Sequence, residues 1–116
     1  MKEPLEKEIQ PRIREVVASL PDVRVFEHNV FPCWDCGKRP SKDTGLGEHA
    51  ADLLVIVGPY GRACFIEVKR PSNRNAKRDA PQREWAKFVR RVGGVAGVAT
   101  NEAEAIALVA EARGLP

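Results

Sequence analysis

Two short apolar runs separated by a tight turn constrain this chain more than any other feature of its sequence. Residues 53–57 read Leu-Leu-Val-Ile-Val, residues 64–66 read Cys-Phe-Ile, and Gly58-Pro-Tyr-Gly61 lies between them. β-Branched and aromatic runs on either side of a Gly/Pro turn are typical of a β-hairpin. Nearly continuous apolar runs are typical of strands that are covered on both faces. We therefore expect a hairpin inside an α/β domain, with helices packed against its sheet.

The length of the turn sets which residues of the hairpin face one another. If the two residues between Gly58 and Gly61 form the whole loop, these glycines pair. Asp52 lies six residues before Gly58, and Glu67 lies six residues after Gly61. The two acids are then directly opposite, with their Cβ atoms about 5 Å apart. Lys69, two residues further along, points to the same face. A loop that is one residue longer or shorter would separate the acids.

Opposed carboxylates repel each other, so this arrangement needs a compensating partner. A divalent cation supplies one, and Mg²⁺ is typically held by one or two carboxylates together with water and phosphate oxygens. Asp52, Glu67 and the backbone carbonyl of Val68 are the expected ligands. Lys69 could stabilise charge on a phosphate or help to deprotonate a water. The alternative is an exposed face with a plain Glu–Lys ion pair.

The remaining sequence predicts further helices and strands around this hairpin. Their expected order is helix 4–20, strand 23–30, loop 31–48, strands 51–57 and 63–70, loop 71–79, helix 81–92, strand 95–100 and a helix from Asn101 to Arg113. Pro11 predicts either a kink near residue 7 or a later start of the first helix. We expect one α/β domain over residues 1–116, with an αβββαβα order and a mixed four-stranded sheet. No apolar run reaches the ~20 residues of a membrane span, and the polar N-terminus does not resemble a signal peptide.

Two helices offer additional polar residues to the expected site. Glu6 lies closer to the apolar stripe of the first helix than the other acids of that helix, so it can face the sheet as a third carboxylate. Glu8 is the alternative if Pro11 changes the phase of the helix. The apolar stripe of the second helix consists of Trp85, Val89 and Val92. Gln82 borders this stripe one turn earlier and could orient a water or contact a metal ligand; the alternative is a plain surface glutamine.

Positive charge is concentrated in one part of the chain. Residues 69–91 contain nine Lys and Arg but two acids, a net charge of +7 in a chain whose total is +3. Such a basic block beside an acidic remainder is typical of proteins that bind a polyanion such as nucleic acid, although a solvated helix face would look similar. The candidate DNA contacts are Arg70, Arg74, Lys77, Arg78, Arg83, Lys87 and, before the hairpin, His49.

Three cysteines are too few and of the wrong parity for a disulfide scaffold. Cys33 and Cys36 form a CxxC pair that resembles half of a zinc knuckle, but a closed zinc site needs four ligands. The other candidates for zinc ligands are His28, His49 and Cys64, of which the last is expected inside a strand. A zinc-dependent interaction module is therefore one alternative function.

The motifs together resemble the VRR-NUC family of virus-type replication and repair nucleases, within the PD-(D/E)xK nuclease superfamily. The matching stretches are Glu6-Lys-Glu-Ile-Gln10, Val25-Phe-Glu-His-Asn29, Ala51-Asp52-Leu53-Leu54 after Gly47, Phe65-Ile-Glu-Val-Lys69, Gln82-Arg-Glu-Trp85 and Gly93-Gly-Val-Ala-Gly-Val-Ala99. The resemblance implies a restriction-endonuclease-like core. It also implies metal-site roles for Glu6, Asp52, Glu67 and Gln82, and makes Lys69 the catalytic lysine.

The resemblance further implies a homodimeric endonuclease that uses Mg²⁺ or Mn²⁺ and cuts branched DNA such as four-way (Holliday) junctions. The expected location is the cytoplasm of a bacterial or phage-infected cell. Two positions depart from the family pattern: Ala51 stands where a proline is usual, and Val98-Ala99-Thr100 replaces the namesake Val-Arg-Arg. The alternatives are a non-catalytic DNA-binding module and a nuclease that processes flaps or DNA ends.

Overall fold

The elements follow the expected αβββαβα order. The computed structural model describes residues 2–28, 51–74, 76 and 79–114. The elements are α1 (Glu6–Ala18), β1 (Val23–Glu27), β2 (Leu53–Val57), β3 (Arg62–Val68), the 3₁₀ turn η1 (Pro71–Asn73), α2 (Ala80–Arg91), β4 (Val95–Ala99) and α3 (Glu102–Arg113). The strands form one sheet in the order β1-β2-β3-β4. β1, β2 and β3 are antiparallel, whereas β3 and β4 are parallel, so the mixed sheet is confirmed.

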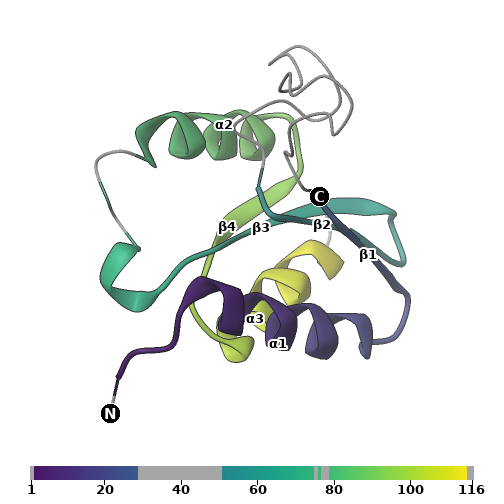
Figure 1. Ribbon diagram of the computed structural model, residues 1–116. Helices are drawn as coiled ribbons and strands as arrows, with labels where there is room; N and C mark the ends of the chain where they lie inside the picture. The colour runs from purple at the N-terminus through teal and green to yellow at the C-terminus, as the bar shows by residue number, and fades with distance from the viewer. Residues whose placement is uncertain (1, 29–50, 75, 77–78, 115–116) are drawn as a thin grey trace, which may run out of the picture.

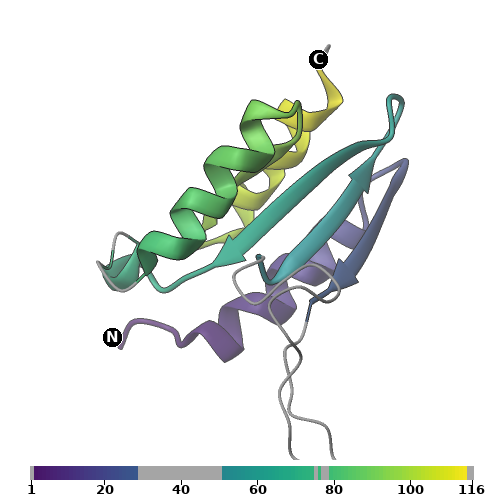
Figure 2. The ribbon, with the colours of Figure 1, turned by 90° about the horizontal axis from the view of Figure 1, so that it is seen from above.

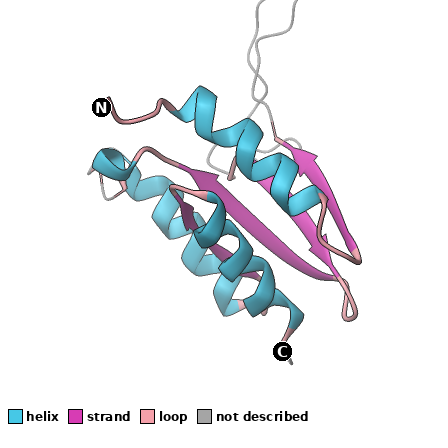
Figure 3. Ribbon diagram, turned by 90° about the horizontal axis from the view of Figure 1, so that it is seen from below, coloured by secondary structure: helices cyan, strands magenta, loops and turns pink. Residues whose placement is uncertain are grey.

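Helices cover the two faces of the sheet unequally. In Figure 1, α2 lies above the sheet, and α1 and α3 lie below it. The view from below in Figure 3 shows α1 and α3 side by side across the strands. The larger core lies on this side, where apolar residues of both helices meet alternate residues of β2 and β3. Its largest fully buried side chains include Ile13, Val17, Leu53, Val55 and Ile66.

On the opposite face, α2 lies over β3 and β4, as Figure 2 shows from above. Phe65 and Ala96 pack there against Val89 of α2, and the ring of Trp85 meets that of Phe65 edge-on at 4.6 Å between centroids. β3 is buried from residue 64 to 68, as the apolar run predicted. The same prediction is wrong for β2, since Ile56 is 37% exposed; α2 packs on β3 and β4 and does not extend over β2.

Several element ends differ from the sequence-based expectation. α1 begins at Glu6 and runs through Pro11, so the later start is wrong; the proline removes one backbone hydrogen bond near the start of the helix. Val92 was expected in the buried stripe of α2 but is 64% exposed, because α2 ends at Arg91. Asn101 caps α3 as predicted, and its side chain accepts a hydrogen bond from the N–H of Glu104. None of the helices in the described residues is long and apolar enough to cross a membrane.

Packing of α1 on the sheet should contribute strongly to stability. Ile13 is fully buried beneath the sheet, and truncation of a buried isoleucine typically costs about 2–5 kcal/mol. We expect Ile13→Ala to lower the free energy of unfolding by this amount in urea denaturation. Arg12→Ala, at the exposed neighbouring position, should change it by less than about 0.5 kcal/mol. Equal effects of the two variants would contradict the packing of α1 described above.

Candidate active site

The hairpin register brings Asp52 to Glu67. Leu53 pairs with Ile66, so the preceding residue, Asp52, lies opposite Glu67 as the loop length predicted. Asp52 itself stands just before β2, and its Oδ2 accepts a hydrogen bond of 2.8 Å from the N–H of Val68. On the other side, its backbone carbonyl accepts the N–H of His28 at 2.8 Å. Asp52 is therefore fixed between the ends of β1 and β3.

Burial and mutual repulsion dominate the electrostatics of this pair. Burial raises the pKa of Glu67, the charge of Asp52 raises it further, and the result is about 8. Burial also raises the pKa of Asp52, although the hydrogen bond from Val68 opposes the shift. At neutral pH the two acids consequently tend to share a proton. Because the two negative charges repel each other, the acids do not both ionise freely. A bound cation would favour the ionised form of both acids and displace the proton.

Lys69 is a buried cation beside this pair. Its side chain is 9% exposed, and its Nζ lies 3.6 Å from Glu67 Oε1 and 3.3 Å from Asp79 Oδ2. Burial works against its charge, but the charges of Glu67 and Asp79 outweigh this effect and raise the pKa of Lys69. Lys69 is therefore protonated at neutral pH. This protonation state suits the stabilisation of negative charge, one of the two roles expected for Lys69.

Asp79 belongs to the site, although reasoning from the sequence missed it. It stands immediately before α2, and its side chain reaches back to Lys69. The available signal was its isolation: Asp79 is the one acid in the otherwise neutral or basic stretch from residue 70 to 83. An acid in such surroundings compensates a local excess of positive charge.

Gln82 lies on the first turn of α2 and faces the same cavity. The cavity has a volume of about 50 Å³, and its polar lining includes Glu67, Lys69, Asp79 and Gln82. That is enough space for at least one water molecule. The Oε1 of Gln82 is buried without a hydrogen-bond partner among the described residues. Because buried polar oxygens are normally paired, this oxygen is suited to accept a hydrogen bond from a water or ligand in the cavity.

Glu6 approaches the site from α1, whereas Glu8 does not. Glu6 is half-buried and Glu8 is exposed. The negative charge of Glu6 contributes to the raised pKa values of Glu67 and Lys69, so it acts at a distance. In the part of the chain that the structure describes, no three His, Cys, Asp or Glu side chains form a group that could hold a metal ion. Glu6 therefore does not complete a three-carboxylate centre with Asp52 and Glu67.

Two carboxylates nevertheless fit the donor set of Mg²⁺, which commonly takes one or two protein carboxylates and fills its remaining positions with water and phosphate. Val68 can add its carbonyl oxygen. A residue of an antiparallel pair whose N–H points to the neighbouring strand also turns its C=O to that strand. Since the N–H of Val68 meets Asp52, its carbonyl oxygen lies on the same side of β3.

Contacts of Glu3 with Arg70 and Ser72 hold the segment before α1 next to the end of β3. Glu3 accepts hydrogen bonds from the N–H and hydroxyl of Ser72, at 2.7 and 2.8 Å, and forms an ion pair of 3.2 Å with Arg70. The hydrogen bond from the Ser72 backbone is the main reason for the lowered pKa of Glu3. Arg70, expected to contact DNA, thus serves in the structure to fix the N-terminal segment next to residues 70–72.

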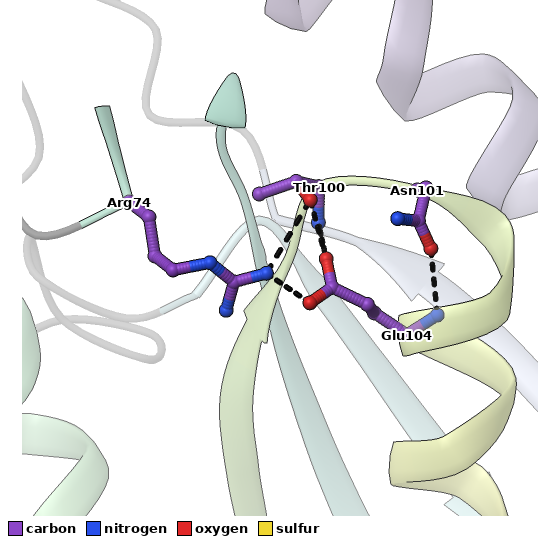
Figure 4. Close-up of polar contacts among 4 residues, drawn as sticks. All are labelled: Arg74, Thr100, Asn101 and Glu104. Atoms are coloured by element: carbon purple, nitrogen blue, oxygen red, sulfur yellow. Dashed lines mark hydrogen bonds and ion pairs between the residues drawn. The ribbon is translucent and has the colours of Figure 1, made fainter. Parts of the chain in front are cut away.

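Arg74 is also engaged within the protein. Figure 4 shows its guanidinium reaching the start of α3, where it pairs with Glu104 and contacts the hydroxyl of Thr100. Glu104 in turn accepts the N–H of Thr100 at 2.8 Å. Arg74 lines the cavity as well. This network ties the segment after β3 to α3 and shapes one wall of the cavity.

The remaining predicted DNA contacts divide into two groups. Arg83 donates to the carbonyl of Ala76 at 2.7 Å, and exposed Lys87 pairs with Glu84 at 3.1 Å. Exposed pairs of this kind contribute at most about 1 kcal/mol, so Lys87 can exchange its partner for a phosphate. The candidates that lie outside the described residues are Lys77, Arg78 and His49.

Cys64 is inside β3 as expected and contributes to the larger core. Burial raises the pKa of its thiol to about 12, which opposes the thiolate form that binds zinc. Cys33 and Cys36 lie outside the described residues.

No protein-family model matches the chain, and neither a curated protein nor a solved structure matches it.

Proposed function

We propose that this protein is a divalent-metal-dependent endodeoxyribonuclease of the VRR-NUC type. The observation that carries the proposal is the hairpin register, which brings Asp52 to Glu67 and Lys69 where β2 begins and β3 ends. Buried, mutually repelling carboxylates beside a protonated lysine are suited to bind a cation and a phosphate together. A structural ion pair alone gives no reason for the second carboxylate.

The roles of the residues follow from their contacts. Asp52 and Glu67 would hold Mg²⁺ or Mn²⁺, with the Val68 carbonyl as a further oxygen. When bound, the ion supplies an activated water and positive charge for the phosphodiester. Lys69 stabilises the negative charge that develops on the phosphate as the attacking water adds. The N–H of Val68 keeps Asp52 in place, and Gln82 orients a water in the cavity.

The substrate and assembly are part of the same proposal. The resemblance to VRR-NUC proteins favours branched DNA, four-way junctions in particular, and a homodimer. Two sites related by a twofold axis would cut two strands symmetrically. The basic block between residues 69 and 91 would attract the DNA backbone, with Lys87 and Arg83 on the exposed side of α2.

A cleavage panel tests this proposal. Purified protein is incubated with linear, flapped and four-way DNA of the same sequence, in Mg²⁺, Mn²⁺ or EDTA. We expect four-way DNA to be cut with either ion and no substrate to be cut in EDTA. Preferential cutting of flaps or ends would correct the substrate. DNA binding without cleavage under either ion would replace the proposal with a non-catalytic DNA-binding module.

A further inference from the structure

Asp79 occupies the position that caps α2, yet its side chain does not cap. An aspartate at this position normally accepts a hydrogen bond from the second or third N–H of its helix. Within the described residues, Asp79 makes no such side-chain bond, and its backbone (φ −94°, ψ 14°) is outside the extended region usual for a cap. Its side chain is 14% exposed and is directed at Lys69, 3.3 Å away. Asp79 thus forms an ion pair with Lys69 in place of a capping hydrogen bond to its own helix.

The ion pair with Asp79 is the closer of the two that Lys69 makes. The Nζ lies 3.6 Å from Glu67 but 3.3 Å from Asp79. Oδ2 of Asp79 has no hydrogen-bond donor elsewhere in the described residues, so Lys69 is the partner that compensates its burial. A divalent ion on Glu67 would repel the Lys69 ammonium and weaken its contact with that carboxylate. Asp79 would then remain as the nearest anion to hold it.

We propose that Asp79 is a positioning residue that holds the Lys69 ammonium at the cavity, against repulsion by a cation bound beside it. The inference rests on the proposed function, since the position of Lys69 matters for phosphodiester cleavage. Asp79 acts through Lys69 and is not among the expected metal ligands. Its location at the start of α2 joins the position of the lysine to the helix that also carries Gln82.

The kinetic test compares Asp79→Asn with Asp22→Asn. The first removes a buried charge with little change of shape; the second is the control, at an exposed turn position with φ 54° that asparagine tolerates. Asp79→Asn should lower kcat on four-way DNA by roughly 10- to 100-fold, with KM for DNA and the Kd for Mn²⁺ unchanged. In a Lys69→Met background, Asp79→Asn should cause no further loss. The inference would be overturned if Asp79→Asn left kcat unchanged. It would also be overturned if Asp79→Asn lowered kcat by the same factor in the Lys69→Met background as in the native protein.

A second measurement does not depend on cleavage. The ¹H–¹⁵N resonance of the Lys69 ammonium should be protected from exchange with water in the native protein and should disappear in Asp79→Asn but not in Asp22→Asn. Persistence of the resonance in Asp79→Asn would overturn the inference even if the protein cleaves DNA. If the native protein cleaves no DNA but the resonance is lost in Asp79→Asn alone, the proposed function fails. The contact between Asp79 and Lys69 is supported in that case.

Discussion

Replacing Lys69 with methionine is expected to reduce the rate of DNA cleavage by about 10²- to 10³-fold, the usual effect of removing one charge-stabilising group from an active site. Methionine retains the apolar stem of the side chain and removes its charge. DNA affinity should remain nearly constant, because Lys69 is buried and binding to DNA depends mainly on exposed contacts to phosphates. Single-turnover cleavage and electrophoretic mobility shifts measure the two quantities separately.

The matched control is Lys7→Met, which removes the same charge from an exposed position on α1. It should leave the cleavage rate within about twofold, as expected for a surface change away from special contacts. Cleavage by Lys69→Met at the native rate would rule out the assignment of Lys69 as the catalytic lysine. A melting temperature measured for each variant separates loss of chemistry from loss of fold.

The metal-free protein should become less stable as pH rises from about 5 to 8. Glu67 has an ordinary pKa of 4.5 and a pKa of about 8 in the folded protein. Between these values the folded state binds more protons than the unfolded state, so stability present at low pH is lost as pH increases. One such group changes the free energy of unfolding by up to about 1.4 kcal/mol per pH unit. The raised pKa of Asp52 acts in the same direction.

Urea denaturation in EDTA at several pH values measures this effect. Glu67→Gln should flatten the decline, whereas Glu15→Gln, at an exposed position, should preserve it. Acids with lowered pKa values, such as Glu104 and Glu111, lose their contribution below pH 4.5 and do not shape this range. Mg²⁺ or Mn²⁺ should restore stability at pH 8 by binding the deprotonated pair. An identical pH slope in native protein and Glu67→Gln would contradict the raised pKa.

The sequence was sufficient for the parts of the site that depend on local geometry. A two-residue loop fixes the register of a hairpin, and alternation along a strand fixes its faces. The sequence alone therefore predicts that Asp52, Glu67 and Lys69 lie together. The αβββαβα order followed in the same way from periodicity and from the turn and cap residues, such as Asn101 at the start of α3.

Long-range side-chain contacts were beyond such reasoning. The pairs of Arg70 with Glu3 and of Arg74 with Glu104 join residues far apart in the chain, so the sequence presented both arginines as available for DNA. Asp79 was missed for a related reason: the sequence places it at the end of a polar loop, and its contact with Lys69 depends on how α2 is placed over β3. Exposure of Ile56 likewise depends on which strands α2 covers.

Apart from Glu6, the groups assigned to chemistry all come from one continuous stretch between Asp52 and Gln82. Each contact among them closes a short loop of the chain, through the hairpin or through the connection from β3 to α2. Short loops cost little entropy to close, so this stretch can assemble early in folding, before α1 and α3 dock. α1 and α3 then support the sheet from below, and the residues on their exposed faces can vary in sequence. An engineer could remodel those surfaces, or graft the stretch onto another sheet of the same topology, while leaving the reactive groups in register.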